Sequence, residues 1–318
     1  MMVPNRPCRS AFLVLVAMGI GGRAYGILPV ASSGDFYVSN HNADSIAVYD
    51  AAGTYLHSFT AGGLNGPRGV VFAPDGRCFV AGQLNHEVFV FTPDEQFVGT
   101  FGSGFLSSPT GMAISDAGEL HVCSFNNDEV VVFDLAGNHL RSYSHPTLHG
   151  PNCVMFDPVG NIFVSSAINA QVIKFDANET FVTSFTGGGL SSPMGIARDV
   201  NNTLYVAGGG SDNIVKFDTN GTFLGQMAHP DLTGPQGIAF DDRGHLFSSS
   251  FLQGTVVEFD EVGGYVQTIT DGGLQIPRSI AFVSTGNPIP AASAWGVMIM
   301  ALLMLPVATL TFRRRRAE

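Results

Sequence analysis

Residues 193–218 read PMGIARDVNNTLYVAGGGSDNIVKFD, and related stretches recur along most of the chain. The proline that begins this stretch recurs every 42 residues, at Pro67, Pro109, Pro151, Pro193, Pro235 and Pro277. The aromatic residue near its end recurs with the same period, at Tyr49, Phe91, Phe133, Phe175, Phe217 and Phe259. A fixed period without insertions indicates an array of equivalent structural units, so the structure of one unit predicts that of the array.

Each unit contains four short apolar segments separated by turns rich in glycine or aspartate. In the unit that begins at Pro235, these segments are residues 237–240, 246–249, 256–259 and 265–269. Short segments of this kind predict the strands of an antiparallel meander. Four strands in about 40 residues are typical of a β-propeller blade, whereas a parallel solenoid, the alternative, usually has a shorter repeat.

The two ends of the array predict how the ring closes. The array starts at Gly34 with segments that match only the second, third and fourth strands of a unit. It ends with residues 277–282, which match only a first strand. One blade built from both ends completes a ring of six without an open sheet edge. The sequence therefore predicts an all-β, six-bladed propeller of four-stranded antiparallel blades over residues 34–283.

Three motifs of the unit resemble a known repeat family. They are Pro-x-Gly-Ile-Ala at residues 193–197, Leu-Tyr-Val-Ala at residues 204–207 and Ile-Val-Lys-Phe-Asp at residues 214–218. Together they resemble the NHL repeat, and the resemblance covers residues 34–283. It implies a β-propeller, in agreement with the strand pattern.

The first 26 residues have the layout of a secretory signal peptide. Arg6 and Arg9 precede an apolar segment, residues 11–20, and small residues follow as far as Gly26. The apolar segment is too short for an ordinary membrane-spanning helix. We therefore expect the export machinery to recognise residues 1–26; an amphipathic N-terminal helix is the alternative.

The C-terminal segment has the layout of a sorting signal. Residues 295–312 carry no charge and an arginine cluster follows, so residues 295–318 are predicted to form a transmembrane helix with a basic cytoplasmic end. With the linker of residues 284–294, this helix resembles an IPTL-type C-terminal sorting signal of bacteria. The resemblance rests on Ile289, Pro290, Trp295, Gly296, Arg313, Arg314, Arg315 and Arg316. It implies that an exosortase-like membrane protease removes the helix from a membrane-anchored precursor, which then reaches the cell surface; a plain tail anchor is the alternative.

Charge divides the chain into an acidic body and basic ends. The 318 residues carry a formal net charge of −11, but seven of the 15 basic residues lie in the two terminal segments. The remaining body has eight basic and 25 acidic residues, which gives it a net charge of −17. Such a body repels phosphate backbones, so the charge argues against nucleic-acid binding.

The candidate ligand site is the ring of residues that follow the repeated prolines, at the expected mouth of the central channel. These residues are Arg68, Thr110, Asn152, Met194, Gln236 and Arg278. Because the closed ring places the last unit beside the first, Arg68 and Arg278 should be neighbours and could bind a carboxylate or another anion. The alternative is that they neutralise nearby aspartates such as Asp44.

Arg198 stands where most units have phenylalanine, and indicates either a buried functional charge or a local strand adjustment beside Asp199.

The histidines and cysteines do not predict a metal site. His121 and His139 stand where other units have Tyr or Phe, so both should pack as aromatic residues, whereas His245 stands at a turn and should be solvated. No set of three zinc ligands is expected to converge, so neither a metal nor another cofactor is predicted. Cys123 and Cys153 should lie at the same end of adjacent blades, where a disulfide and the packing of two buried thiols are both open.

This pattern favours a binding or interaction module with its ligand at the channel mouth. The ligand could be a protein, a glycan or a small molecule. Some six-bladed propellers are enzymes, so the alternative is a hydrolase or lyase, lactonase-like or streptogramin-lyase-like, that uses a divalent cation in the channel. The predicted ring offers mostly neutral polar groups and two arginines, and therefore no general base with a suitable pKa. No catalytic residue is assigned.

Overall fold

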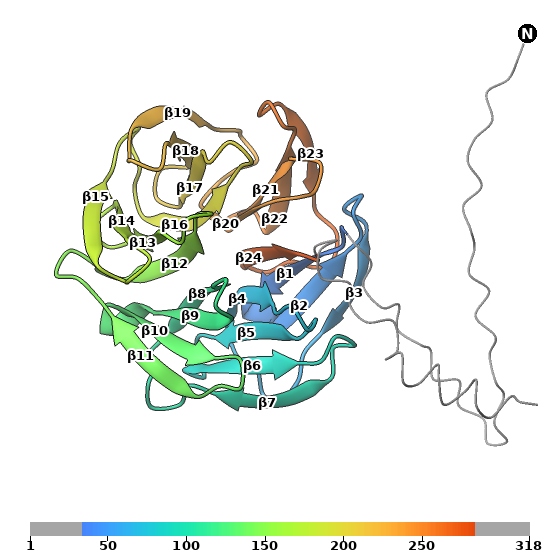
Figure 1. The fold of residues 1–318 in the computed structure, drawn as a ribbon. Helices are drawn as coiled ribbons and strands as arrows, with labels where there is room; N and C mark the ends of the chain where they lie inside the picture. Colours follow the sequence, from blue (N-terminus) through green and yellow to red (C-terminus); the bar gives the residue numbers. More distant parts are fainter. Residues whose placement is uncertain (1–33, 284–318) are drawn as a thin grey trace, which may run out of the picture.

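The fold is a closed ring of six blades around a central channel (Figure 1). The computed structural model describes residues 34–283, in which 24 strands form six four-stranded sheets. Neighbouring strands within each sheet are antiparallel, and the innermost strand of each blade begins at one of the repeated prolines. The predicted all-β, six-bladed propeller is therefore confirmed.

Several predictions concern segments outside the described residues. They are the signal peptide of residues 1–26, the linker of residues 284–294 and the sorting helix of residues 295–318, with Ile289, Pro290, Trp295, Gly296, Arg313, Arg314, Arg315 and Arg316. Between residues 34 and 283 the helical elements are two 3₁₀ turns, η1 (His41–Ala43) and η2 (Phe125–Asn127). In this part of the chain no helix has the length and hydrophobicity of a membrane span.

We number the blades from the one that closes the ring. Blade 1 contains β24 (Pro277–Phe282), β1 (Phe36–Asn40), β2 (Ser45–Tyr49) and β3 (Tyr55–Phe59). Blade 2 contains β4 (Pro67–Phe72), β5 (Cys78–Gly82), β6 (Glu87–Phe91) and β7 (Phe97–Phe101). Blade 3 contains β8 (Pro109–Ile114), β9 (Glu119–Ser124), β10 (Glu129–Asp134) and β11 (His139–Tyr143). Blade 4 contains β12 (Pro151–Phe156), β13 (Ile162–Ser166), β14 (Gln171–Phe175) and β15 (Phe181–Phe185). Blade 5 contains β16 (Pro193–Arg198), β17 (Leu204–Gly208), β18 (Asn213–Phe217) and β19 (Phe223–Met227). Blade 6 contains β20 (Pro235–Phe240), β21 (Leu246–Ser250), β22 (Thr255–Phe259) and β23 (Tyr265–Ile269).

Both ends of the described chain meet in blade 1. Phe36 of β1 lies opposite Phe282 of β24 in an antiparallel ladder. Beyond the strands, the Gly34 N–H donates to the Val283 carbonyl at 3.1 Å, and the Val283 N–H donates to the Asp35 carbonyl at 2.9 Å. The prediction that the first strand of this blade comes from the end of the array is confirmed.

The start of each inner strand is irregular in a way that positions the channel residues. In blade 2, Pro67 pairs with Gly82, and the next paired residue of β4 is Val70, opposite Val80. Proline suits the first position of a strand because it cannot donate a ladder hydrogen bond. An irregularity of this kind changes the direction of the side chains within it, and here it contains the residue predicted to line the channel mouth.

Glycine follows two residues after most of these prolines because neighbouring inner strands approach closely there. A Cβ on Gly111 would lie 2.5 Å from the carbonyl oxygen of Asn152, and one on Gly195 would lie 2.6 Å from that of Gln236. Neither glycine has a positive φ. Space between the strands, and not an unusual backbone conformation, therefore selects glycine at this position.

The recurring aromatic residues of the third strands form the core between blades. Tyr49, Phe91, Phe133, Phe175, Phe217 and Phe259 are each at most 2 % exposed. The ring centroid of Phe91 lies 5.2 Å from that of Phe59 in the preceding blade, in an edge-to-face arrangement. Burial of one such side chain stabilises a protein by roughly 2–3 kcal/mol, so this repeated contact is a main reason why the blades hold together.

Two histidines and two cysteines occupy packing positions in blades 3 and 4, with His121 and Cys123 buried and His139 exposed. The His121 ring centroid lies 4.9 Å from that of Phe156, and His139 stacks on Phe105 at 4.2 Å. The prediction that both histidines occupy aromatic packing positions is confirmed. Cys123 and Cys153 are free thiols, so of the two possibilities for this pair the structure has packing and not a disulfide.

Candidate functional site

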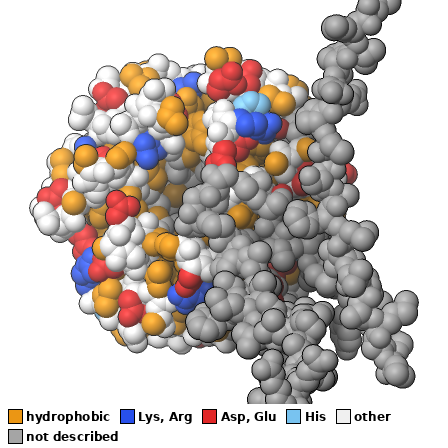
Figure 2. Space-filling model, turned by 45° about the vertical axis from the view of Figure 1, so that its right-hand side comes forward, with side chains coloured by type: hydrophobic (Ala, Val, Ile, Leu, Met, Phe, Trp, Pro, Cys, Tyr) orange, Lys and Arg blue, Asp and Glu red, His pale blue; other side chains and the backbone are white. Residues whose placement is uncertain are grey.

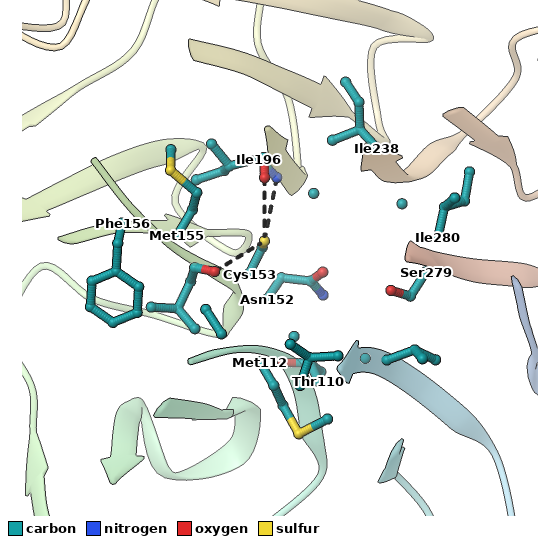
Figure 3. A pocket seen from close by; sticks show the side chains of 18 of the residues that line it. Thr110, Met112, Asn152, Cys153, Met155, Phe156, Ile196, Ile238, Ser279 and Ile280 are labelled. Atoms are coloured by element: carbon teal, nitrogen blue, oxygen red, sulfur yellow. Dashed lines mark hydrogen bonds between the residues drawn. The ribbon is translucent and has the colours of Figure 1, made fainter. Parts of the chain in front are cut away.

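A cavity of about 500 Å³ follows the channel and is lined by residues of all six inner strands. Figure 3 shows some of these side chains from different blades, among them Asn152, Ile238 and Ser279, arranged around the channel. A cavity of this size is in the range of small-molecule sites in proteins. The channel is therefore the candidate ligand site.

The structure brings five of the six predicted ring residues into this cavity. They are Arg68, Thr110, Asn152, Gln236 and Arg278. Met194 is not among the lining residues and packs against the apolar cluster that contains Ala207 and Ile238. The hydroxyl of Thr110 donates to the Pro151 carbonyl at 2.9 Å, so it mainly links two blades. We name the remaining four residues, Arg68, Asn152, Gln236 and Arg278, the polar ring.

Arg68 and Arg278 are neighbours in the polar ring, as predicted. Burial, and secondarily the positive charge of Arg278, lower the pKa of Arg68 to about 9. Burial lowers the pKa of Arg278 to about 10. Two cations thus lie side by side in a poorly solvated place, which is costly unless an anion compensates them.

Within residues 34–283 the hydrogen-bond partners of the two guanidinium groups are neutral amides. Arg68 Nε donates to Gln83 Oε1 at 2.8 Å, and Arg278 Nη1 donates to Gln236 Oε1 at 3.0 Å. The buried Nε of Arg278 has no hydrogen-bond partner among these residues. The alternative that the arginines neutralise Asp44 is not borne out: within residues 34–283 neither arginine forms an ion pair with Asp44, and the Asp44 carboxylate accepts the backbone N–H of Gly66 at 2.8 Å.

Two residues that the sequence reasoning missed hold the arginines in place. Gln83, which accepts from Arg68, itself donates from Nε2 to Ser108 Oγ at 2.8 Å. The ring of Phe251 lies beneath Arg278, with its centroid 4.3 Å from Cζ. Both residues directly follow the second strand of their blade, at a position that varies between units: His41, Gln83, Phe125, Ala167, Gly209 and Phe251. This variation between units was the feature of the sequence that could have identified Gln83 and Phe251.

Aliphatic side chains line the next level of the channel. They come from all six blades: Val70, Met112, Val154, Ile196, Ile238 and Ile280, each between 2 % and 8 % exposed. We name this set the aliphatic ring. It lies two positions further along the inner strands than the polar ring, which corresponds to a depth of roughly 7 Å. The channel is therefore polar at the end with Arg68 and Arg278 and apolar at the level of the aliphatic ring.

Cys153 stands at the close-packed position that most blades fill with glycine. Its Sγ accepts the Ile196 N–H at 3.4 Å, an interaction drawn in Figure 3. Burial raises the pKa of this thiol to about 11. The neutral thiol is a poor nucleophile, so Cys153 contributes packing to the channel wall and not reactivity.

Arg198 lines the same cavity at the other end of the inner strand. It keeps the strand register, because it pairs with Leu204 across β16 and β17, and a local strand adjustment is excluded. Its Nη1 donates to Asn202 Oδ1 at 2.8 Å. Its buried Nε has no partner among residues 34–283. Of the two possibilities for Arg198, the structure has a partly buried charge.

One cluster of potential metal ligands lies outside the channel lining, in blade 6, and the sequence did not predict it. Ligand atoms of Asp241, His245 and Glu258 lie within 4.8 Å of one another. Arg243 Nη2 already lies 2.6 Å from Asp241 Oδ2 and 2.9 Å from Glu258 Oε1. His245 Nδ1 lies 2.8 Å from Glu258 Oε1, and its side chain is 18 % exposed, so the expectation of a solvated His245 is wrong. Because Arg243 compensates both carboxylates, this cluster is a network of ion pairs and not a preformed cation site.

Comparisons with known proteins give the fold alone. No protein-family model and no curated protein matches the sequence. Virginiamycin B lyase from Staphylococcus aureus is 15 % identical over 80 % of this chain and 87 % of its own, with a TM-score of 0.62. A structure of a nidogen–laminin complex matches with 14 % identity over 77 % of this chain and 97 % of its own, and a TM-score of 0.67. A Bacteroides caccae protein of unknown function is 15 % identical over 78 % of this chain and 98 % of its own, with a TM-score of 0.63. These proteins share the propeller and too little sequence for any transfer of function.

Proposed function

We propose that the protein is an exported, surface-displayed binding module whose ligand enters the central channel from the arginine end. The observation that carries this proposal is the polar ring. The repeat keeps proline on one side of this position in every blade and glycine on the other side in most. The residue between them nevertheless varies, with arginine in two blades, and in five of the six blades it lines a cavity of about 500 Å³. Different side chains at equivalent positions give the cavity an asymmetric lining, which specific recognition of a small ligand requires.

The proposed location rests on the terminal segments. Residues 1–26 would direct export, and Ile289, Pro290, Trp295, Gly296 and the arginines of residues 313–316 would direct processing by an exosortase-like membrane protease. The precursor would be anchored in the membrane, and the processed propeller would remain at the cell surface. The acidic body excludes nucleic acid from the proposed partners.

A screen of small molecules with a channel-blocking variant tests the binding proposal. In Ile238→Trp, an indole would fill the aliphatic ring. The matched control is Val266→Trp, which adds an indole on outer strand β23, where Val266 is 43 % exposed. Ligands that raise the melting temperature of the wild type should also raise that of Val266→Trp and leave Ile238→Trp unchanged. Equal shifts in all three proteins would place the ligand elsewhere and contradict the proposal.

The second candidate function is a lyase or hydrolase that uses a divalent cation. It is supported by the fold shared with virginiamycin B lyase, for which a catalytically inactive variant with quinupristin has been solved, with 14 % identity to this chain. The residues of this channel do not fit a cation. Among residues 34–283 the cavity lining includes no histidine and two acidic residues. One of these, Asp157, accepts from the Asn161 backbone and side chain at 2.8 Å. Incubation with quinupristin and Mg²⁺, followed by mass spectrometry, should return intact quinupristin; a cleaved product would establish the second candidate.

A further inference from the structure

The polar ring and the aliphatic ring together describe a particular kind of ligand. The first has two adjacent cations, and the second lies roughly 7 Å deeper along the same cavity. We propose that the ligand is a small organic anion, with its carboxylate bound between Arg68 and Arg278 and its apolar body inside the aliphatic ring. This inference rests on the proposed function, because it names the ligand class of the same channel.

The anionic head group follows from the unused donors of the two arginines. Each guanidinium has five N–H groups. Among the described residues Arg68 donates only from Nε, to Gln83, and Arg278 donates only from Nη1, to Gln236. The remaining N–H groups are suited to the two oxygens of a carboxylate, which arginine binds in a bidentate manner. A neutral ligand would leave two neighbouring cations in the channel without compensation.

Both arginines are held in position before any ligand binds. Gln83, itself fixed by Ser108, orients Arg68, while Gln236 and the face of Phe251 orient Arg278. A preorganised pair loses little side-chain entropy on binding, so more of the interaction energy contributes to affinity.

The charge of the whole body limits the size of the anion. Acidic side chains are scattered over the described surface shown in Figure 2, and the body carries a net charge of −17. A polyanion would meet this repulsion over a wide surface, whereas a small anion at the polar ring contacts the two arginines directly. The two acidic residues of the cavity lining, Asp116 and Asp157, lie at the opposite end, after the last residues of β8 and β12. The aliphatic ring then favours a carboxylate with a hydrocarbon body over a highly hydrated anion such as acetate.

Binding of hexanoate and hexanamide to the purified full-length protein, followed by isothermal titration, tests the inference. Hexanamide has the same shape without the charge. We expect hexanoate to bind about tenfold more tightly than hexanamide, and acetate to bind more weakly than hexanoate. Arg68→Gln and Arg278→Gln should each weaken hexanoate binding by about tenfold. The matched control is Arg77→Gln, because Arg77 pairs with Asp75 in the turn between β4 and β5 and does not line the cavity.

The inference is overturned if hexanoate does not bind, if hexanamide binds equally well, or if the two channel variants bind hexanoate like the wild type. The Ile238→Trp variant separates this failure from failure of the proposed function. If hexanoate and hexanamide bind equally well and neither binds to Ile238→Trp, the channel is the ligand site. In that case only the proposal that the ligand is an anion is rejected. Binding of either compound that survives in Ile238→Trp would contradict the channel site itself.

Discussion

The guanidinium group of Arg68 lies beside that of Arg278, and the second positive charge contributes to the lowered pKa of the first. Ring closure alone creates this pair, because β4 begins the first complete blade and β24 comes from the opposite end of the described chain. Arginine keeps its proton in proteins, so the pair is relieved by a bound anion and not by deprotonation. Such a site costs stability when it is empty.

That cost predicts that Arg68→Gln stabilises the protein in the absence of a ligand. Removing one of two half-buried like charges should raise the free energy of unfolding by about 1 kcal/mol in a buffer of low ionic strength. Urea unfolding of the full-length protein measures the difference. Arg77→Gln serves as the control and should not stabilise, since Arg77 is paired with Asp75 at 2.7 Å. A destabilised Arg68→Gln would mean that the pair has a counter-charge after all.

His121 predicts a pH dependence of stability. Burial, with a smaller contribution from Arg141, lowers its pKa to about 4, against about 6.5 in an unfolded chain. Between these values the unfolded chain binds the additional proton, so stability is full above pH 6.5 and falls as the pH decreases toward 4. Phenylalanine occupies the equivalent position in blades 2 and 4, as Phe79 and Phe163. In His121→Phe the pH-dependent contribution of His121 to stability disappears. From pH 6.5 to pH 5 the wild type should lose about 2 kcal/mol more than the variant, by urea unfolding at each pH; parallel curves would refute this.

The close approach of the inner strands predicts opposite behaviour of two glycines. A Cβ on Gly111 would lie 2.5 Å from the Asn152 carbonyl oxygen, whereas one on Gly99 would meet no atom within 4 Å. Gly111→Ala should lower the free energy of unfolding by about 2–3 kcal/mol, because the backbone of the next blade must shift. Gly99→Ala should change it by less than about 0.5 kcal/mol. Similar effects of the two substitutions in denaturant titrations would argue against close contact of the inner strands.

The terminal segments predict the fate of the protein in the cell. Deletion of residues 295–318 should release the propeller into the medium, because it removes the proposed sorting helix. Peptide mass mapping of the surface form of the full chain should lack peptides from this helix. Retention of the helix in the surface form would instead support a plain tail anchor. Cell association of the truncated protein would contradict both the sorting signal and the tail anchor.

The fold could be predicted because the repeat is regular. Six prolines with a constant spacing place every inner strand, and the strand pattern at Gly34 and Pro277 indicates how the ring closes. The packing roles of His121 and His139 followed from the same comparison, because equivalent positions in a repeat share an environment. These inferences need only the 42-residue period, which does not depend on the conformation of any side chain.

The finer features of the site depend on departures from the repeat, and a period cannot predict those. Asp44 was a reasonable partner for Arg68 by charge, but its carboxylate is used by the backbone of Gly66. Met194 stands in the predicted ring but turns to an apolar cluster. The network around Glu258 was missed because its partners come from a turn and from neighbouring strands, with the Gln267 amide at 2.6 Å. Directions of single side chains decided each of these cases.

A crystal structure with bound 6-bromohexanoate would show both ends of the ligand in the channel, since the anomalous signal of bromine locates the apolar body independently of the carboxylate. We predict bromine in contact with Ile238 or Ile280 of the aliphatic ring, and carboxylate oxygens within hydrogen-bond distance of both Arg68 and Arg278. A bromine site outside the channel, or a carboxylate that contacts neither arginine, would contradict the proposed binding of organic anions in the channel.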